Sequence, residues 1–486
     1  MSTVNSSLVH DLLVDLDRTG TTPLHHQIEA ALRDAIRAGR LRHGASLPSS
    51  RRLAAELGVS RGVVVGAYDQ LAAEGYLTST PGSYTRVAAV PGQTAPAPDP
   101  PPASGPLIDF GYGRADPASF PRAAWLRSLR RVLTDAPHDR LNYTDGYGLP
   151  ELRTALADYL NRSRGTCADP AHVLITSGFA QAAMLVTGVL ARRGARRVAV
   201  EDPSAHDDIR HHARTHKLDL FGLPVAEHGI DLDALERGDA DLVVLTPSHQ
   251  WPLGGVLPAR TRMRAVQWAR ARGALILEDD YDAEYRYDRA PIGAMQGLAP
   301  DVVMYAGSAS KTLAPGLRLG WLVLPPHLAD AVAEAKLLAD RGSPAIEQLA
   351  FADFLLRGEF DRHLRRMRPL YRHRRDLLLA RLTQQLPDFE PTGIAAGLHV
   401  VVWLPDDLQE DDVVTAAAAH GVRVAGIAPY RLTTPGRQGL ILGYTSLNDN
   451  QITEGVAALA AAVRQTRART SIPARPLTKR LLAGPI

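Results

Sequence analysis

The chain has 486 residues, 45% of them hydrophobic and 22% charged, which is ordinary for globular proteins and too long for a single hydrophobic core. No segment approaches the roughly 18 uninterrupted apolar residues of a membrane-spanning helix, and the single cysteine, Cys167, excludes a disulfide framework and a cysteine-based metal site. The first ten residues lack the basic and apolar regions of a signal peptide, so we expect a cytoplasmic protein with neither a membrane nor a metal partner.

The basic residues are unevenly distributed along the chain. The formal net charge of +3 does not indicate a nucleic-acid partner, but seven arginines stand against Asp34 and Glu56 between residues 33 and 61, a local net charge of +5. Such a cluster is typical of a solvated surface and also of a DNA contact. Only four of the 55 basic residues are lysines, at positions 217, 311, 336 and 479. A lysine kept in such a composition is a candidate for chemistry that needs a deprotonated amine, which arginine does not supply.

The first unit is predicted to be helical. Leucine or isoleucine recurs at every fourth position over 24–36, which predicts an amphipathic helix ended by Gly39. Ser49 and Ser60 offer N-caps for two further helices, joined by a tight turn at Gly58. Two short helices joined in this way predict a helix-turn-helix, whose second helix enters the major groove of DNA. Segments 76–78 and 84–87 predict a small β-hairpin; a plain helical bundle is the alternative.

The pattern PLHHQI followed by LPSSRRLAAELGVSRGVVVGAYDQLAAEGYL resembles the winged helix-turn-helix of GntR-type transcription regulators over about residues 20–87. This resemblance implies operator DNA as a partner. The residues that it implies are base or phosphate contacts at Arg51 and Arg61, phosphate contacts at Ser49 and Ser60, and a wing tip at Gly82. The chain departs from the family at Tyr84, where a glycine is usual. Its recognition helix also carries residues that offer little hydrogen-bond readout of bases, namely Gly62, Val63 and Val65.

A proline-rich segment divides the chain. Residues 88–106 hold seven prolines and no helical or strand periodicity, which predicts a semi-rigid, extended linker. We therefore expect a DNA-binding domain over 1–87 and a second domain over 107–465. The remaining residues, 466–486, are basic and contain prolines, so we expect a flexible tail there.

Four segments of the second domain suggest a site for a phosphorylated aldehyde cofactor. Residues 173–186 predict a strand, a turn and a helix, and the amides of Gly178, Phe179 and Ala180 at the helix start would bind phosphate. Residues 274–285 predict a strand that runs into Asp279 and Tyr281, which point to the same side and suit a protonated ring nitrogen and a phenolate oxygen.

The third segment, 307–321, surrounds Lys311 with groups that suit a phosphate dianion: Ser308, Ser310 and Arg318. The fourth, 245–255, predicts a strand end and a rigid turn. Each segment alone is better explained as ordinary structure, with Asp279 as a helix cap, Tyr281 in the core and Lys311 on the surface. Their shared placement at strand ends reverses that judgement, because open α/β sheets bind ligands at the carboxyl ends of their strands.

These segments resemble the fold-type-I aminotransferases, which use pyridoxal 5'-phosphate (PLP), across roughly residues 107–465. The match lies in S-x-S-K-x6-R-x-G, from Ser308, and in D-x-Y, from Asp279. The resemblance implies an α/β fold with a mostly parallel sheet flanked by helices and a smaller C-terminal subdomain. It implies that Lys311 holds PLP as a Schiff base, Asp279 pairs with the pyridinium and Tyr281 bonds the ring oxygen. The phosphate would lie against Ser308, Ser310, Arg318 and the backbone of 178–180.

Both halves together resemble the MocR subfamily of GntR-type regulators, with support from TPSHQWP, EDPS, DFGYGRADPASFP and YTDGYGLPELR. Four positions differ from catalytically active aminotransferases. Trp251 and Leu253 replace the usual asparagine and threonine, and His206 stands where an aromatic ring often stacks on the cofactor. Ile441 replaces the arginine that binds the substrate carboxylate, although Arg431 and Arg437 lie nearby in the sequence.

These resemblances predict a PLP-responsive transcription regulator, acting as a homodimer with a domain-swapped arrangement. Loss of the carboxylate anchor favours sensing of PLP itself and control of vitamin B6 synthesis genes, with no physiological turnover. The alternatives are a sensor of γ-aminobutyrate, taurine or a D-amino acid, an active aminotransferase, and a constitutive repressor whose second domain is a scaffold.

Overall fold

The computed structural model describes residues 16–78, 85–88, 108–204, 207–226, 229–287, 292–433 and 436–470. Contacts divide the chain into two compact units, Met1–Ala103 and Ser104–Ile486. The predicted wing tip at Gly82, His206 and nearly all of the predicted linker and tail lie outside the described residues. The last helix, α14 (Asp449–Thr470), continues past residue 466, so the start of the predicted tail is helical. Among the described residues, no helix is long and apolar enough to cross a membrane.

The first unit is a winged helix-turn-helix, as predicted. It contains α1 (Leu24–Arg37), α2 (Ser50–Leu57), α3 (Arg61–Ala73) and the antiparallel pair β1 (Leu77–Thr78) and β2 (Arg86–Val87). Ser49 caps α2, because its hydroxyl accepts the Arg52 N–H at 3.3 Å, and Gly58 ends α2 in the left-handed conformation (φ 61°). Ser60 occupies the N-cap position of α3, but its hydroxyl makes no capping hydrogen bond, which corrects the prediction that its side chain caps this helix.

The second unit is built on an eight-stranded sheet with the order β4-β11-β10-β9-β8-β5-β6-β7. Neighbours from β10 to β6 are parallel, whereas β11 is antiparallel to both its neighbours and β7 is antiparallel to β6. The inner strands are buried on both faces, which explains their continuous apolar runs. The strands are β4 (Val173–Thr176), β5 (Arg197–Asp202), β6 (Asp219–Ala226), β7 (Gly229–Ile230), β8 (Leu242–Leu245), β9 (Leu275–Asp280), β10 (Val303–Ser308) and β11 (Gly320–Val323).

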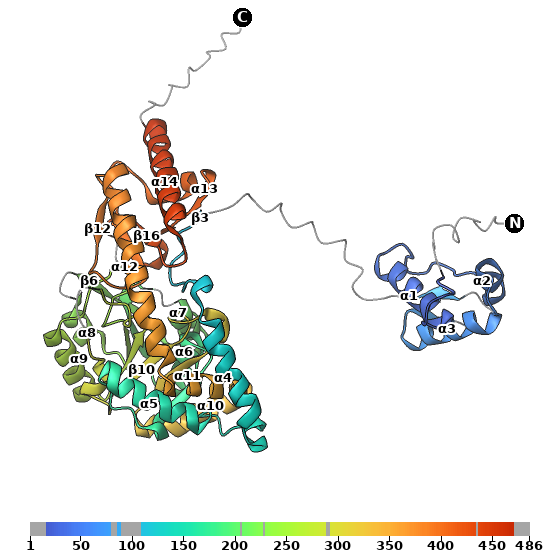
Figure 1. The fold of residues 1–486 in the computed structure, drawn as a ribbon, viewed down its shortest axis with the longest axis horizontal. Coiled ribbons are helices and arrows are strands. Elements are labelled where there is room, and N and C mark those ends of the chain that lie inside the picture. The colour runs from blue at the N-terminus through green and yellow to red at the C-terminus, as the bar shows by residue number, and fades with distance from the viewer. Residues whose placement is uncertain are drawn as a thin grey trace, which may run out of the picture. The chain divides into compact units, whose positions relative to one another are not determined.

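Helices cover both faces of this sheet (Figure 1). Leu174 and Met304 pack with α6 (Phe179–Arg192), α7 (Asp207–His216) and α10 (Pro326–Asp340) on one face. Their neighbours Ile175 and Tyr305 point to the other face, as strand alternation requires. That second face is covered by α5 (Pro150–Arg164), α11 (Ala345–Leu356) and α12 (Glu359–Gln385), and further along by α8 (Leu232–Gly238) and α9 (Ala259–Arg272). Outside them, α4 (Arg122–Asp135) packs on α11.

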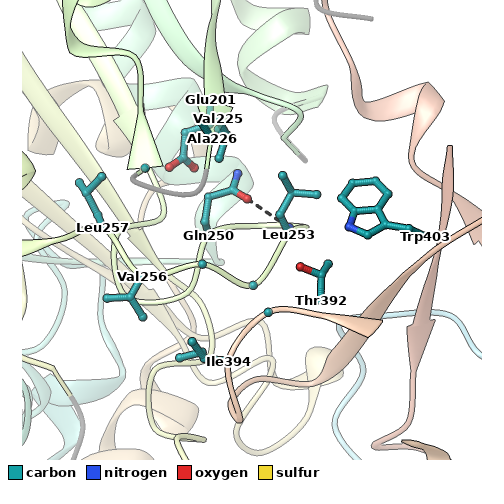
Figure 2. Close-up of a pocket in the computed structure, with 14 residues that line it drawn as sticks. Glu201, Val225, Ala226, Gln250, Leu253, Val256, Leu257, Thr392, Ile394 and Trp403 are labelled. Carbon is teal, nitrogen blue, oxygen red and sulfur yellow. Dashed lines mark hydrogen bonds between the residues drawn. The ribbon is translucent and has the colours of Figure 1, made fainter. Parts of the chain in front are cut away.

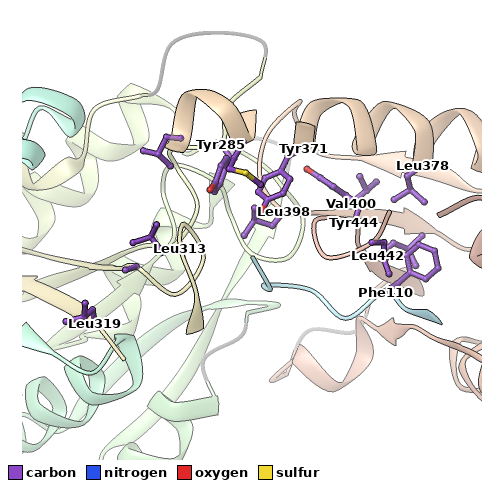
Figure 3. Close-up of a cluster of buried hydrophobic side chains, with 14 of the residues drawn as sticks. Phe110, Tyr285, Leu313, Leu319, Tyr371, Leu378, Leu398, Val400, Leu442 and Tyr444 are labelled. Carbon is purple, nitrogen blue, oxygen red and sulfur yellow. The ribbon is translucent and has the colours of Figure 1, made fainter. Parts of the chain in front are cut away.

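The smaller C-terminal subdomain has a four-stranded sheet with the order β12-β13-β16-β15. Its strands are β12 (Glu390–Thr392), β13 (His399–Trp403), β15 (Ala425–Gly426) and β16 (Gly439–Gly443), and α13 (Glu410–Ala419) and α14 accompany them. The first strand of the unit, β3 (Ile108–Asp109), pairs with β14 (Val422–Arg423). Figure 3 shows side chains of this subdomain, such as Leu442, in one apolar cluster with Tyr285 of the large sheet region.

The second unit also contains short 3-10 helices, at Pro117–Ser119, His138–Leu141, Pro170–His172, Met295–Leu298, Pro315–Leu317 and Ala428–Tyr430. A buried ion pair between Arg374 and Asp116 joins the long helix α12 to the N-terminal part of the second unit. Both terminal nitrogens of Arg374 donate to Asp116 Oδ2 at 3.0 Å, and Nη1 also donates to the carbonyl of Thr445 at 2.5 Å. The described architecture is the predicted α/β fold with a smaller subdomain.

Candidate functional site

A cavity of about 300 Å³ lies at the carboxyl ends of the parallel strands. It brings together every residue that the sequence predicts for the cofactor: Gly178, Phe179, Ala180, Asp279, Tyr281, Ser308, Ser310, Lys311 and Arg318. The wall also contains residues not predicted as site residues: Tyr112, Gly113, Asp208, Thr246, Trp251, Gly307 and His399.

Asp279 turns towards the cavity because side chains alternate along β9. Its neighbour Asp280 points the other way, where it accepts hydrogen bonds from Arg164 Nε and the Tyr305 hydroxyl, both at 2.8 Å. Within the described part of the chain, the Asp279 carboxylate itself has no hydrogen-bond or ion-pair partner. Burial raises the pKa of Asp279 well above its usual value, the charge of Asp280 adds to this rise, and Lys311 opposes it. This carboxylate is therefore suited to a cationic partner inside the cavity.

Lys311 follows β10 and lines the same cavity. Its amine lies where a side chain at Gly113 would stand, only 3.1 Å from a Cβ built there, so that glycine leaves room for it. Burial lowers the pKa of Lys311, and the charge of Asp279 partly opposes this. Of the other lysines in the described residues, Lys217 is exposed and Lys336 is ion-paired with Asp340 at 2.7 Å. Lys311 alone of these three faces the cavity.

One end of the cavity is suited to an anion. Helix α6 starts at Phe179 and has Gly178 (φ 125°) as its N-cap, with no side-chain capping bond, so its first amides are directed at this end. The Arg318 guanidinium reaches the same place, because its Nη2 lies 3.7 Å from a Cβ built on Gly178. Ser308 and Ser310 line the cavity beside it. A helix N-terminus, two hydroxyls and a guanidinium together match the oxygens of a phosphate.

Tyr281 lines the cavity, and its hydroxyl lies 3.0 Å from His249 Nδ1. The same nitrogen lies 2.9 Å from Asp282 Oδ2, so both contacts are made at one position of the His249 ring. Burial raises the pKa of Tyr281 well above its usual value, and the neighbouring carboxyl of Asp282 adds to the rise. The phenol therefore stays protonated, and a bond from it to a cofactor oxygen stays a prediction.

The predicted DNA contacts of the first unit are accessible. Ser49, Arg51, Ser60 and Arg61 are all exposed, around the start of α2 and α3. Arg61 Nε donates weakly to Ser50 Oγ at 3.4 Å. Part of the local positive charge has structural partners, since Arg33 is bonded to Glu74 at 2.8 Å and Arg52 to Glu56 at 2.9 Å.

Comparison with known proteins agrees with both halves of the chain. The family of bacterial regulatory proteins of the gntR type matches residues 24–87, and the aminotransferase class I and II family matches residues 107–459. The probable rhizopine catabolism regulatory protein MocR of Rhizobium meliloti is 32% identical over 94% of this chain and 97% of its own length. The chain belongs to the MocR subfamily of GntR-type transcription regulators.

Two further relatives bear on the cofactor of this MocR-type regulator. The pyridoxine biosynthesis transcriptional regulator PdxR of Corynebacterium glutamicum is 32% identical over 94% of this chain and 99% of its own length. The α-aminoadipate aminotransferase LysN of Thermus thermophilus, solved with N-(5'-phosphopyridoxyl)-L-leucine, superposes with a TM-score of 0.68 at 29% identity, over 75% of this chain and 94% of that one. The fold, the family and this neighbour indicate PLP as the cofactor of the C-terminal domain.

Among the described residues of this MocR-type chain, an apolar side chain occupies the position where the sequence comparison predicts a carboxylate-binding arginine in active aminotransferases. Ile441 is fully buried in an apolar cluster with Trp251, Val401 and Ile427. Arg437 is directed elsewhere, because it bonds Glu390 at 2.7 Å and lies over the ring of Trp403 at 5.4 Å.

Arg431 does not replace it, since its Nη2 donates to the carbonyl of Arg437 at 3.0 Å and it does not line the cavity. Among the described residues of the cavity wall, the arginine and lysine side chains are Arg318 and Lys311. His399 is held neutral, because burial lowers its pKa to about 4. Neither arginine near Ile441 therefore serves as the substituted anchor in this structure.

Proposed function

We propose that PLP in the C-terminal domain controls DNA binding by this regulator, and that the genes it controls serve vitamin B6 synthesis. The observation that carries this proposal is the apolar cluster around Ile441, which takes the place of a carboxylate anchor. A site that holds PLP but not an amino acid responds to the cofactor itself. The pyridoxine biosynthesis regulator PdxR among the relatives supports the same regulated genes.

The residues of the cavity supply what PLP binding needs. Lys311 would hold the cofactor covalently, and its lowered pKa keeps more of the amine in the reactive neutral form. Asp279 would keep a proton on the pyridine nitrogen, while the start of α6, Ser308, Ser310 and Arg318 would bind the phosphate. When bound, PLP supplies an aldehyde that reacts with primary amines and a ring that withdraws electrons from the attached carbon.

The regulator would act as a homodimer with a domain-swapped arrangement. Large apolar side chains are exposed on the C-terminal unit, including Leu133 at 67%, Tyr143 at 84% and Leu338 at 70% of their surface. Leu126 lies two turns before Leu133 on α4, on the same face of that helix. Association of two chains through these side chains would remove them from water, and a two-fold dimer would present a pair of winged helix-turn-helix units to a palindromic operator.

The decisive experiment measures operator affinity with and without PLP. Selection from a random duplex library defines the operator, and fluorescence anisotropy then gives the dissociation constant. We expect PLP to change the affinity of the wild type by at least fivefold and to leave Lys311→Ala unaffected. An equal response of both proteins, or none in either, contradicts control by PLP.

DNA binding by the winged helix-turn-helix is tested with Arg51→Ala and Arg61→Ala. Arg52→Ala is the matched control, since Arg52 is ion-paired with Glu56. A base contact at Arg61 is worth about 1–3 kcal/mol and its loss relaxes specificity at one position. A uniform loss over all sequences with a shallower salt dependence identifies a phosphate contact instead. PLP absorption should be the same in all three variants.

Catalysis is tested by product analysis with alanine, glutamate, γ-aminobutyrate and taurine as amino donors. A missing charge-assisted pair weakens binding by about 1.5–3 kcal/mol, or one to two orders of magnitude, and poor orientation slows the reaction further. We therefore expect no multiple turnover at enzyme-like rates. Rapid turnover with any of the four would establish an aminotransferase, and a change of operator affinity with one of them alone would identify that compound as the effector.

A further inference from the structure

A second, larger cavity of about 390 Å³ lies between the large sheet region and the small subdomain (Figure 2). One wall comes from the end of β5, the end of β6 and the turn 253–257. The opposite wall comes from Thr392 to Ile394 and from Trp403 of β13. None of the predicted cofactor residues lines it. A molecule bound here would touch both parts of the C-terminal unit at once.

Among the described residues, the wall is mostly apolar and contains one carboxylate. Figure 2 shows Leu253, Ile394 and Trp403 around the space, with the carboxylate of Glu201 at its edge. Glu201 is only 1% exposed. Its Oε2 accepts hydrogen bonds from the Thr246 N–H at 3.0 Å and hydroxyl at 2.5 Å, but no basic side chain in the described ranges forms an ion pair with it. A buried carboxylate without a cation is costly, and a cationic ligand removes that cost.

Glu201 also links the two cavities. The Thr246 hydroxyl that donates to Glu201 accepts a hydrogen bond from the Trp251 N–H at 3.0 Å. Thr246 and Trp251 both line the cofactor cavity. The turn that follows Trp251 then forms the floor of the second cavity, where Gln250 accepts from the Leu253 N–H at 3.1 Å. A change at Glu201 therefore reaches the cofactor cavity through two hydrogen bonds.

We propose that this second cavity is a binding site for a small organic cation with an apolar body, and that its occupancy is coupled to PLP binding. The ammonium group would pair with Glu201, and the apolar body would lie against Leu253, Ile394 and Trp403. Burial raises the pKa of Glu201 to about 7, which a bound cation would lower again. The coupling is reciprocal, since each ligand changes the affinity of the other by the same factor.

The probe is N,N-dimethyl-2-phenylethylamine, because a tertiary amine cannot condense with the PLP aldehyde and so does not report on Lys311. Calorimetry with the full-length protein measures its dissociation constant with and without PLP. We expect binding by the wild type, no binding of phenylacetate, and at least a threefold difference in amine affinity between the two cofactor states. Equal affinity in both states overturns the coupling.

Two variants test the location of the site. Glu201→Gln keeps the shape and removes the charge, so we expect at least tenfold weaker binding of the amine. Ala226→Trp fills the cavity from an exposed strand position, and we expect it to abolish binding. Glu334→Gln, at an exposed position on α10, is the matched control. Unchanged affinity in both cavity variants overturns the proposal. An amine dissociation constant that rises in proportion to the PLP concentration without reaching a limit also overturns it, because two coupled sites give a limiting change and a shared site does not. Operator and PLP affinities measured on the same proteins test the regulatory function separately.

Discussion

At the scale of single residues, the cofactor cavity holds an acid and a base whose pKa values are shifted in opposite directions by the same burial. Burial raises the pKa of Asp279 and lowers that of Lys311, and each charge opposes the shift of the other. Before PLP binds, both groups are therefore less charged than in water. The cofactor offers each of them a partner, a ring nitrogen for the acid and an aldehyde for the amine.

The opposing effects of burial and of Asp279 predict how the protonation of the Lys311 amine depends on pH. Because burial lowers its pKa below 10.5, the neutral amine should dominate at a lower pH than for an ordinary lysine. The negative charge of Asp279 favours the ammonium form, so Asp279→Asn should move the midpoint lower still. The measurement is the rate of Lys311 acetylation by acetic anhydride against pH, read by mass spectrometry in PLP-free protein. Lys217, which is exposed, is the internal control. A Lys311 midpoint above that of Lys217 contradicts the prediction.

At the scale of elements, the phosphate end of the cavity depends on how closely β11 approaches the start of α6. Gly320 of β11 pairs with Ser308 of β10 and with Thr176 of β4. A Cβ built on Gly320 would lie 2.6 Å from the Gly178 Cα, which no side chain tolerates.

We therefore expect Gly320→Ala to move the start of α6 and to weaken PLP binding at least tenfold, as measured by absorbance titration. Gly316→Ala is the control, because a Cβ there has no neighbour within 4 Å and the residue is exposed. Equal PLP affinity in the two variants would show that the phosphate does not need this close approach.

Helix α12 offers a stability test with its own control. Arg374 and Asp116 are both nearly buried, so Arg374→Met leaves a carboxylate uncompensated in the interior. Such a loss is typically about 3–5 kcal/mol. Arg372 is 63% exposed and 3.8 Å from Asp376, so Arg372→Met should change stability by no more than about 0.5 kcal/mol. Urea unfolding followed by tryptophan fluorescence measures both, and equal free energies of unfolding would contradict the assigned role of the pair.

At the scale of the whole molecule, two units with separate cores should unfold separately. The apolar core of the first unit shares no residue with those of the second. All five tryptophans lie in the second unit, so tryptophan fluorescence follows that unit alone.

We expect PLP at a hundredfold excess over its dissociation constant to stabilise the tryptophan transition by about 2.7 kcal/mol. Thermal unfolding followed by far-UV circular dichroism should show a further transition that PLP does not move. In Lys311→Ala, the shift of the tryptophan transition should be smaller. A single transition, shifted as a whole by PLP, would mean that the units unfold together.

The sequence predicted which residues would line this cavity because each of them lies close to a strand end. Asp279 lies in the last two residues of β9 and Lys311 three residues after β10, so their placement needs only the rule that parallel strands end at one edge. His399 gave no such signal, since it belongs to the small subdomain and reaches the cavity through tertiary packing. The sequence also did not predict where the Arg437 side chain points, because this depends on its contacts with Glu390 and with the ring of Trp403. Local pattern predicted the elements, and long-range packing decided which side chains meet.

The burial of Ile441 limits how this protein could evolve back towards amino-acid chemistry. An arginine restored at this position by a single codon change would place a guanidinium among the buried apolar side chains of Trp251, Val401 and Ile427. Removing an ion from water without a partner costs several kcal/mol, enough to unfold many domains. A return to amino-acid chemistry would therefore need several neighbours to change before the arginine does. Selection acting one substitution at a time would meet an unstable intermediate, which makes the specialisation hard to reverse.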